Sequence, residues 1–368
     1  MRVVVVRPDD LGPSEAALWA KFQHSSPITL NPFLSLSFAQ AVGRARPTAR
    51  VAVVEESNKI ESFLPYELTS KRIARPIGWP MNDLQGFIGS GMNIDPRSVV
   101  KKAGLRGWRF DHALAEQRML APYCYPGTIS PTWEMDLTNG YTAYLNNLSK
   151  TIVRKTGQKR RALERQFGDV RLQWSSPASE HFRTLIDWKT DQYRRTGVQE
   201  LFSDPGTLRI VEELAATNYE DCRGVMSALL AGERLVAVHF GIQGPGYLSS
   251  WFPAYDQELS RFSPGMIMWF TLAEEASNWA VARISLGYGK LGFKMQVASE
   301  SYGVVEGAVW ASRIEQASRN LQGRLLSSSF LLNRVPKWAR SRLRILIRNP
   351  RPGIEKLRIA PMHGSDKS

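Results

Sequence analysis

A turn in the C-terminal half of the chain combines the residue types that bind anions. Ser263-Pro264-Gly265 follows a strand-like segment, residues 247–254, and opens an apolar helix. Ser263 suits the N-cap and Pro264 suits the first helical turn, where a missing N–H costs nothing. Free N–H groups and the positive end of the helix dipole favour an anion there, and a pyrophosphate would fit beside Gly265. The alternative is an ordinary buried strand–helix–strand unit, which needs no ligand.

The elements around this turn must hold it at the edge of a sheet. The helix after Pro264 has apolar or small side chains at helical spacing, namely Met266, Trp269, Phe270, Ala273, Ala276, Ser277 and Ala280. A short strand over 284–286 follows, residues 287–289 break it, and a further helix is predicted to begin near Leu291. A strand, a crossover helix and a second strand predict parallel pairing.

Composition limits the classes of protein. The chain has 368 residues, of which 43% are hydrophobic and 22% charged, as in soluble globular proteins of two or three domains. The net charge of +14 favours an anionic partner such as nucleic acid, a phosphorylated cofactor or an anionic membrane. Cys124 and Cys222 lie far apart, so neither a metal site nor a disulfide framework is expected. The four consecutive valines before Arg7 are too few for the apolar core of a signal peptide, and no apolar run is long enough to span a membrane, so the cytoplasm is expected.

Two stretches repeat one order of elements. In each, two helices precede a hairpin with a short polar turn, VAVVEESNKIESFLPYEL in the first and VMSALLAGERLVAVHFGI in the second. This pattern suggests a duplicated α/β unit. We therefore predict an N-terminal unit over 1–140, a basic connecting helix over 141–174, a C-terminal unit over 175–312 and a basic tail over 313–368.

A loop is expected over residues 76–91, PIGWPMNDLQGFIGSG, because Gly and Pro are frequent and periodicity is weak. Asp83 and Gln85 are polar candidates there, since loops on a rigid scaffold often carry function. The alternative is a structural turn in which Asp83 binds its own backbone.

Two segments concentrate positive charge. The helical segment 141–168 is either a solvated helix or a track for a phosphate-bearing ligand. It has few interleaved aromatic residues, so single-stranded nucleic acid is less favoured. In the tail, VPKWARSRLRILIRNPRP predicts either an amphipathic helix at an anionic membrane surface or a helix packed on the body.

Several motifs together resemble a known family. The segment WFPAYDQELSRFSPGMIM resembles the strand-to-helix signature of CelD/BcsL-type acyltransferases of the GNAT superfamily. The segments GYGKLGFKMQ, PIGWPMNDLQGFI and LSKTIVRKTGQKRRALER resemble its closing motif, its N-terminal loop and its basic helix. Fem-type transferases, with two GNAT-like units in tandem, are more remotely similar. The resemblance covers most of residues 30–312. It implies an α/β (α+β) fold of two tandem GNAT-like units, each a mixed, largely antiparallel sheet flanked by helices.

The resemblance also implies a function. An N- or O-acyltransferase would move an acyl group from acyl-CoA, acetyl-CoA or longer, to an amine or hydroxyl of a cell-surface polysaccharide, glycolipid or related precursor. Such an enzyme would work in the cytoplasm or at the inner face of the membrane. By position, the pyrophosphate of the cofactor would be held by residues Arg261, Ser263, Pro264, Gly265 and Met266. The alternatives are a Fem-like aminoacyl-tRNA-dependent transferase and a non-catalytic scaffold in polysaccharide assembly.

Acyl transfer needs a base that removes a proton from the acceptor and a donor for the oxyanion. Asp256, just after the strand, is the first candidate base, with a turn or cap as its alternative role. His239 lies within a predicted strand and would face either the cleft or the core. Tyr288 would donate to the leaving thiolate. Acceptor binding is assigned to Lys294, Asp83 and Gln85.

Overall fold

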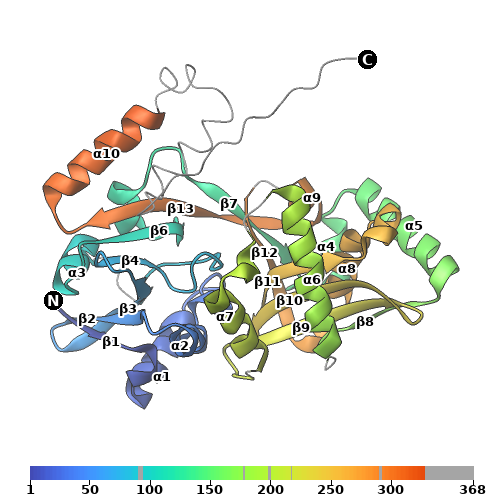
Figure 1. Cartoon of the computed structure of the whole chain (residues 1–368), viewed down its shortest axis with the longest axis horizontal. Coiled ribbons are helices and arrows are strands. Elements are labelled where there is room, and N and C mark those ends of the chain that lie inside the picture. The colour runs from blue at the N-terminus through green and yellow to red at the C-terminus, as the bar shows by residue number, and fades with distance from the viewer. Residues whose placement is uncertain (90–93, 177–178, 198–199, 217, 290–291, 328–368) are drawn as a thin grey trace, which may run out of the picture. The chain divides into compact units, whose positions relative to one another are not determined.

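One mixed sheet organises the chain. The computed structural model describes residues 1–89, 94–176, 179–197, 200–216, 218–289 and 292–327. The part of the chain so described forms a 13-stranded sheet with the order β1-β2-β3-β4-β6-β13-β7-β12-β11-β10-β9-β8, and β5 pairs with β3 (Figure 1). The strands are β1 Arg2–Val6, β2 Ala49–Glu56, β3 Lys59–Leu68, β4 Ile73–Pro76, β5 Ile88–Gly89, β6 Gly107–Leu114, β7 Ser130–Asp136, β8 Val170–Gln173, β9 Arg223–Ala231, β10 Arg234–Gly244, β11 Gly246–Tyr255, β12 Val281–Tyr288 and β13 Glu300–Trp310.

Helices cover both faces of this sheet. The helices are α1 Pro13–Gln23, α2 Leu36–Ala45, α3 Pro96–Lys102, α4 Gly140–Asn146, α5 Lys150–Phe167, α6 Ser179–Thr196, α7 Pro205–Ala216, α8 Pro264–Glu275, α9 Gly292–Val297 and α10 Arg313–Ser327. Helices α1, α2, α6 and α7 share one apolar core with strands from both halves of the chain. On the opposite face, α3 packs on the N-terminal strands, and α4, α5, α8 and α9 pack on the C-terminal strands.

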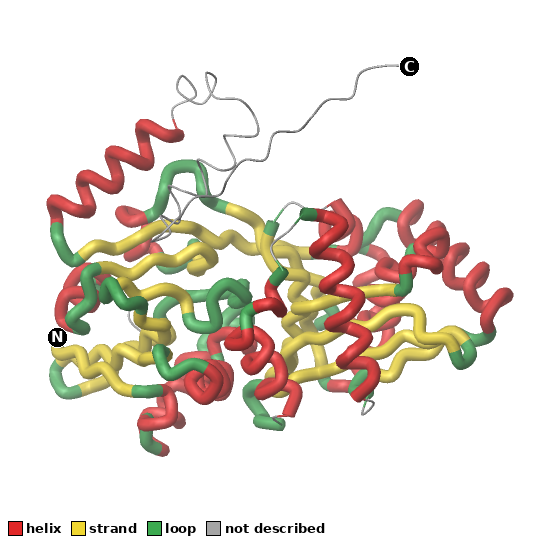
Figure 2. Tube along the Cα trace, viewed as in Figure 1, coloured by secondary structure: helices red, strands yellow, loops and turns green. Residues whose placement is uncertain are grey.

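The strand pairing is mostly antiparallel, as the sequence predicts. The two predicted hairpins form as β2–β3 and β9–β10, and the parallel pair predicted around α8 forms as β11–β12. A second parallel pair joins β4 to β6. This is the predicted mixed α/β fold, with a large, mostly antiparallel sheet flanked by helices (Figure 2).

The two halves of the chain interleave at the middle of the sheet. Strand β7, which precedes the basic segment, lies between β12 and β13 and is antiparallel to both. Strand β13, which the sequence analysis did not identify, returns to pair with β6 of the N-terminal half. Each half therefore completes the sheet of the other.

The basic segment differs from the single helix that was predicted. Helices α4 and α5 form there, separated at residues 147–149. The chain then continues into β8 at Val170. Tyr144 and Leu148, at the end of α4, and Leu163, in α5, are buried in the same core, so burying these apolar groups accounts for the bend.

Strands β11 and β12 diverge after a short shared segment. Their register runs from Gly246–Val281 to Ser249–Ser285, whereas β11 continues to Tyr255. A bulge at Trp251 interrupts the pairing of β11 with β10. Because a bulge leaves two successive side chains on one face, Trp251 and Phe252 stack with ring centroids 5.1 Å apart. The divergence opens the sheet beside the start of α8.

The chain divides into two units, Met1–Gln316 and a second that begins at Ala317 and is described here only as far as residue 327. Within the first unit, the start of α10 is held by Gln316, whose side chain accepts from the backbone N–H of Trp310 and donates to the carbonyl of Ala308. The tail segment predicted to contact a membrane, 335–352, lies outside the described residues. In the described part of the chain, no helix is both long and apolar enough to cross a membrane.

Candidate functional site

A loop of the N-terminal half meets the end of β12. Asp83, on the predicted loop, approaches Gly287 so closely that a Cβ there would lie 2.5 Å from Oδ2 of Asp83 and 3.5 Å from Nζ of Lys294. Gly287 also has φ +77, so this position requires glycine on both grounds. Lys294, on α9, donates from Nζ to the carbonyl oxygen of Tyr288 at 2.9 Å. Three of the predicted site residues, Asp83, Lys294 and Tyr288, therefore come together.

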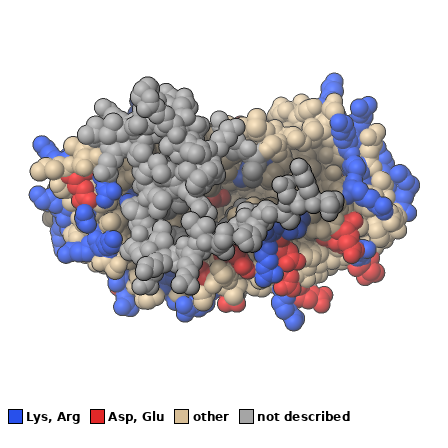
Figure 3. Space-filling model, turned by 45° about the horizontal axis from the view of Figure 1, so that its top comes forward, with Lys and Arg blue, Asp and Glu red and all other residues tan. Residues whose placement is uncertain are grey.

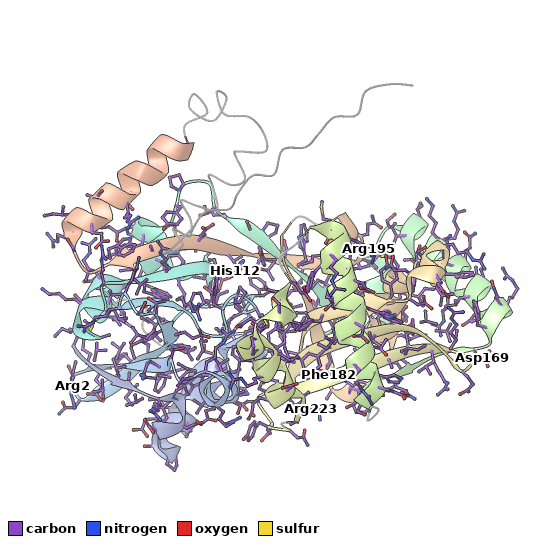
Figure 4. The ribbon with its side chains drawn as sticks, in the orientation of Figure 1. Arg2, His112, Asp169, Phe182, Arg195 and Arg223 are labelled. Carbon is purple, nitrogen blue, oxygen red and sulfur yellow. The ribbon has the colours of Figure 1, made fainter. Side chains whose placement is uncertain are left out.

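His112 on β6 completes this cluster, and the sequence analysis missed it. Its ring lies against the ring of Tyr288, with centroids 3.7 Å apart and the planes tilted by 41°, while Tyr288 is 43% exposed (Figure 4 labels His112). The Nδ1 atom of His112 faces Oδ1 of Asp111 and the carbonyl of Asn82, each at 3.3 Å. Because Nδ1 faces two acceptors, the neutral form of the ring carries its hydrogen on Nδ1 and its lone pair on Nε2.

The charges of the cluster alter one another. Burial raises the pKa of the Asp83 carboxyl, and the charges of His112 and Lys294 only partly oppose this. Burial lowers the pKa of the Lys294 ammonium, with Asp83 opposing it. Burial alone would lower the pKa of His112, but the hydrogen bond and charge of Asp111 outweigh it, and the pKa is raised. The cluster therefore contains an acid and bases whose pKa values move toward neutrality, as catalytic groups require.

The loop that carries Asp83 is fixed by a buried ion network. Glu67, which is fully buried, accepts from Arg46 at 3.0 Å and from Nε of Arg75 at 3.0 Å. It also accepts from the backbone N–H of Gly78 at 3.1 Å. The buried carboxylate of Glu67 can stay charged because each of these neighbours donates a hydrogen bond to it. The network ties the start of the loop to β3.

The middle of the loop is held from both halves of the chain. Asn82 caps the backbone N–H of Leu84 at 2.8 Å, which is the turn role considered for Asp83. The indole N–H of Trp251, at the bulge of β11, donates to the carbonyl of Met81 at 2.8 Å. Asp83 itself accepts no hydrogen bond within the residues that the structure describes.

Gln85 contacts Asp111 within the protein, and its predicted binding of the acceptor stays a prediction. Its amide oxygen accepts from the backbone N–H of Asp111 at 3.1 Å, and its amide nitrogen donates to the Asp111 carboxylate. Gln85 is buried. It therefore fixes the carboxylate that orients His112.

The cofactor residues were predicted at the start of α8, which follows the end of β11 and contacts β10 and β11. Ser263 occupies the N-cap position with φ +56, and its side chain makes no capping hydrogen bond. Pro264 is the first helical residue, and a Cβ at Gly265 would meet only Tyr255, at 3.7 Å. The backbone N–H of Met266 is already bonded to the carbonyl of Ser263, at 3.0 Å. Gly265 thus offers the open approach that was predicted.

Cations surround this helix start. Arg261 donates to Oε1 of Gln166 at 2.7 Å and lies over the ring of Phe262 at 4.7 Å. Lys159, on α5, donates from Nζ to the carbonyl of Arg261. Two positive side chains therefore flank the open end of α8, which favours an anionic group there.

Asp256 lies away from the cluster and is already engaged. Its carboxylate accepts from Arg234 at 2.7 Å and from the backbone N–H of Glu258 at 2.9 Å. These are the contacts of a cap, the alternative role considered for it. Its assignment as a base remains a prediction.

His239 is also separate from the cluster. It is fully buried on β10, its ring lies 5.5 Å from that of Trp269 on α8, and burial lowers its pKa to about 3. Neither ring nitrogen has a hydrogen-bond partner within the described part of the chain. The histidine is thus neutral and packed in the core, and a catalytic role for it remains a prediction.

A second buried carboxylate lies beneath the divergence. Glu134 on β7 accepts from the hydroxyl of Tyr247 and pairs with Arg283 at 3.2 Å. Burial raises its pKa to about 7. It thereby links β7, β11 and β12 below the point where β11 and β12 separate. An acidic residue inside the apolar alternation PTWEMDL is the signal that could have identified it.

The divergence, the cation-flanked start of α8 and the end of β12 all lie within residues that match a known family. Residues 152–295 match the family described as acetyltransferase (GNAT) domain. That segment is therefore similar to a GNAT acetyltransferase domain, and the match supports acyltransferase activity. Among curated proteins, the sequence has no match.

Solved structures resemble this chain, and FemX and a protein from Bacteroides thetaiotaomicron do so with TM-scores above 0.5, which indicates a shared fold. FemX is 10% identical, with 86% of this chain and 99% of that chain covered and a TM-score of 0.57. A conserved protein of unknown function from Bacteroides thetaiotaomicron is 12% identical, with 82% and 98% covered and a TM-score of 0.53. A tandem GNAT protein from the clavulanic acid biosynthesis pathway is 10% identical, with 84% and 98% covered and a TM-score of 0.47. At these identities the similarity concerns the fold.

Proposed function

We propose that the chain transfers an acyl group from acyl-CoA, acetyl-CoA or longer, to an amine or hydroxyl of an acceptor. One observation carries this proposal: β11 and β12 stop pairing after Ser249–Ser285, and a buried acid–base cluster lies at the open end of β12. The thioester would enter the divergence, with the pyrophosphate beside Gly265, Arg261 and Lys159.

The cluster supports a division of roles. His112 takes the proton of the acceptor on Nε2, while Asp111 holds its Nδ1–H. The acceptor attacks the thioester carbonyl, the carbon–sulfur bond breaks, and Lys294 gives a proton to the leaving thiolate. Asp83 binds the acceptor beside Gly287. The products are the acylated acceptor and free coenzyme A. The proton that His112 took then passes through solvent to Lys294, so both groups are restored and atoms and charges balance.

The exposed ring of Tyr288 supports a sugar-containing acceptor. A half-exposed aromatic ring beside carboxylates offers an apolar platform together with hydrogen-bond acceptors, the combination that suits a sugar face. A polysaccharide or glycolipid precursor, as in CelD/BcsL-type enzymes, is therefore the proposed acceptor. Contact of the basic tail with a membrane surface at the inner face of the cytoplasmic membrane is part of the same proposal.

Titration calorimetry with acetyl-CoA and longer acyl-CoAs tests whether the protein binds the proposed donor.

His112→Ala tests the proposed base. This variant should bind acyl-CoA as wild type does, yet its rate of transfer should fall by roughly 100-fold or more, measured as release of free thiol with candidate acceptors. Lys294→Arg should lose transfer at every pH, because arginine holds its proton and cannot give it to the leaving thiolate. Absence of binding to any thioester contradicts the proposal. Binding with transfer unaffected by His112→Ala contradicts the assigned base.

A second donor, aminoacyl-tRNA, is favoured by the fold shared with FemX and by the net charge of +14. Salt-sensitive tRNA binding with transfer of a labelled amino acid would establish it.

The other alternative is a non-catalytic scaffold. It is supported if cluster variants such as Asp83→Asn leave the function of the protein in cells intact.

A further inference from the structure

Helix α5 presents a row of cations that the proposed chemistry does not use. Lys150, Arg154, Arg161 and Arg165 are all exposed, with Gln158 between them. At 3.6 residues per turn these five side chains fall within about 80° of the helix circumference and extend along about 22 Å. We call this row the basic stripe. Figure 3 shows Lys and Arg gathered on the side of the molecule where α5 lies.

The basic stripe points away from the protein core. The buried residues of α5, Thr156 and Leu163, lie on the opposite side of the helix. The acidic residue of α5, Glu164, is paired with Arg160, which also binds Glu274 on α8. Within the described part of the chain, the stripe cations take part in no ion pair. Four uncompensated charges in a row repel one another unless an anionic partner is present.

A hollow adjoins one end of the stripe. It has a volume of about 350 Å³ and is lined by Leu145, Asn146, Lys150, Val153 and Arg154. Apolar side chains therefore lie directly beside two stripe cations. A phosphodiester backbone would contact the cations but not the apolar side chains, whereas a phospholipid has a phosphate for the cations and hydrocarbon for the apolar side chains. In addition, no large exposed aromatic residue lies on the described α4 or α5 for stacking of nucleobases.

We propose that the basic stripe docks the protein on an anionic phospholipid surface. A planar bilayer meets the outermost line of a helix that lies along it, and a straight row of cations matches that geometry. Leu145 and Val153 contact the apolar edge of the headgroup layer. This contact is independent of the proposed acyl transfer and of the tail segment.

A probe on the stripe tests the contact in the full chain. Gln158→Cys, in a Cys124→Ala background, places an environment-sensitive fluorophore among the four cations, while Cys222 is fully buried. Vesicles of phosphatidylcholine mixed with phosphatidylglycerol should change its emission, and vesicles of phosphatidylcholine alone should not. The change should decline with added salt. An unchanged emission with anionic vesicles overturns the proposal, whatever the tail does.

Charge neutralisation tests specificity. The variant K150Q/R154Q/R161Q/R165Q should weaken the response of the probe to anionic vesicles by roughly 100-fold or more. The matched control K71Q/K101Q/K102Q/R118Q removes the same charge from exposed, unpaired positions in the N-terminal half and should have little effect. An equal loss in both variants would mean that net charge alone acts, and the proposal fails.

Two other ligands are measured on the same variants. If stripe neutralisation abolishes binding of duplex RNA while vesicle binding is unaffected, the partner is nucleic acid and not lipid. If it lowers acyl-CoA affinity while vesicle binding is unaffected, the stripe belongs to the cofactor site. Failure of the proposed acyl transfer would instead appear as absent thioester binding in wild type, so the two failures are distinguishable.

Discussion

His112 receives its pKa from two opposing effects, and this makes its proposed role testable. Burial lowers the pKa of His112, and the hydrogen bond and charge of Asp111 raise it by more than burial lowers it. The net pKa therefore lies above the ordinary value of 6.5. A base must be unprotonated, so the activity of wild type should rise as pH passes above 6.5. Removing the charge of Asp111 takes away the dominant raising effect.

Asp111→Asn should therefore move the acid limb of the pH–rate profile to lower pH. The amide can still accept from Nδ1, so the ring should keep its place while the charge is lost. The profile of kcat/KM for thiol release is the measurement. Glu116→Gln, an exposed carboxylate on the following loop, serves as the control. An acid limb that stays at the wild-type pH would exclude His112 as the titrating base.

Glu134 predicts a pH dependence of stability. Its pKa is about 7 in the folded protein against an ordinary value of 4.5, because burial disfavours the charge. A raised pKa contributes stability that is fully present below about pH 4.5 and is lost as pH rises through 7. Glu134→Gln is neutral at every pH and lacks this loss. Its free energy of unfolding relative to wild type should rise by up to about 3 kcal/mol between pH 5 and pH 8.

Denaturant unfolding at both pH values measures this change. Glu300→Gln removes another partner of Arg283, at 2.8 Å, but from a half-exposed side chain, and so serves as the control. A difference between Glu134→Gln and wild type that does not depend on pH would mean that Glu134 is ionised in the folded protein throughout.

At the residue scale, the sequence identified only part of the site. Asp83, Lys294 and Tyr288 stand out because polar or aromatic groups in Gly-rich turns have few local roles. His112 and Glu134 lie inside strands, where a single polar residue resembles an outward-facing position. Only the pairing of β6 with β13 and of β7 with β12 buries them, and those pairings join residues distant in sequence.

At the scale of elements, the start of α8 decides whether a cofactor can bind. Gly265→Val places a branched side chain at the open first turn. An added Cβ meets Tyr255 only at ordinary contact distance, so the fold should tolerate it. If the pyrophosphate lies there, acyl-CoA affinity should fall by roughly tenfold or more while the melting temperature stays within a few degrees.

Gly157→Val is the matched control for that variant. Position 157 is also helical, and an added Cβ there meets only the flexible end of Arg161, at 3.4 Å. Calorimetry and thermal melting on the same samples separate binding from folding. A folded Gly265→Val protein with wild-type affinity would place the cofactor elsewhere.

Local pattern predicted most elements, because their signals are local. The hairpins follow from alternation with turn residues, and the start of α8 follows from Ser-Pro-Gly. The break between α4 and α5 was missed, since the sequence there contains neither Gly nor Pro. Tertiary burial of Tyr144 and Leu148 produces it instead.

At the scale of the molecule, the interleaved strands make the two halves depend on each other. Strand β7 has β12 and β13 as its neighbours, so a fragment of residues 1–139 would leave both of its edges unpaired. The complementary fragment, residues 140–368, would lose the strand between β12 and β13. Unpaired central edges expose backbone groups and apolar side chains, which favours aggregation.

Each fragment expressed alone should therefore be insoluble or lack a cooperative melt, whereas the two expressed together should form a stable complex. Cleavage between Asn139 and Gly140 falls between a turn and the first residue of α4, so the strands themselves are unchanged. Gel filtration and circular dichroism of the single and paired fragments give the result. If residues 140–368 melted cooperatively alone and bound acyl-CoA, the C-terminal unit would be autonomous, and β7 would be dispensable for the site. If the pair reassembles with thiol release restored, the acid–base cluster, built from Asp83 and His112 of one fragment and Lys294 of the other, is a product of that assembly.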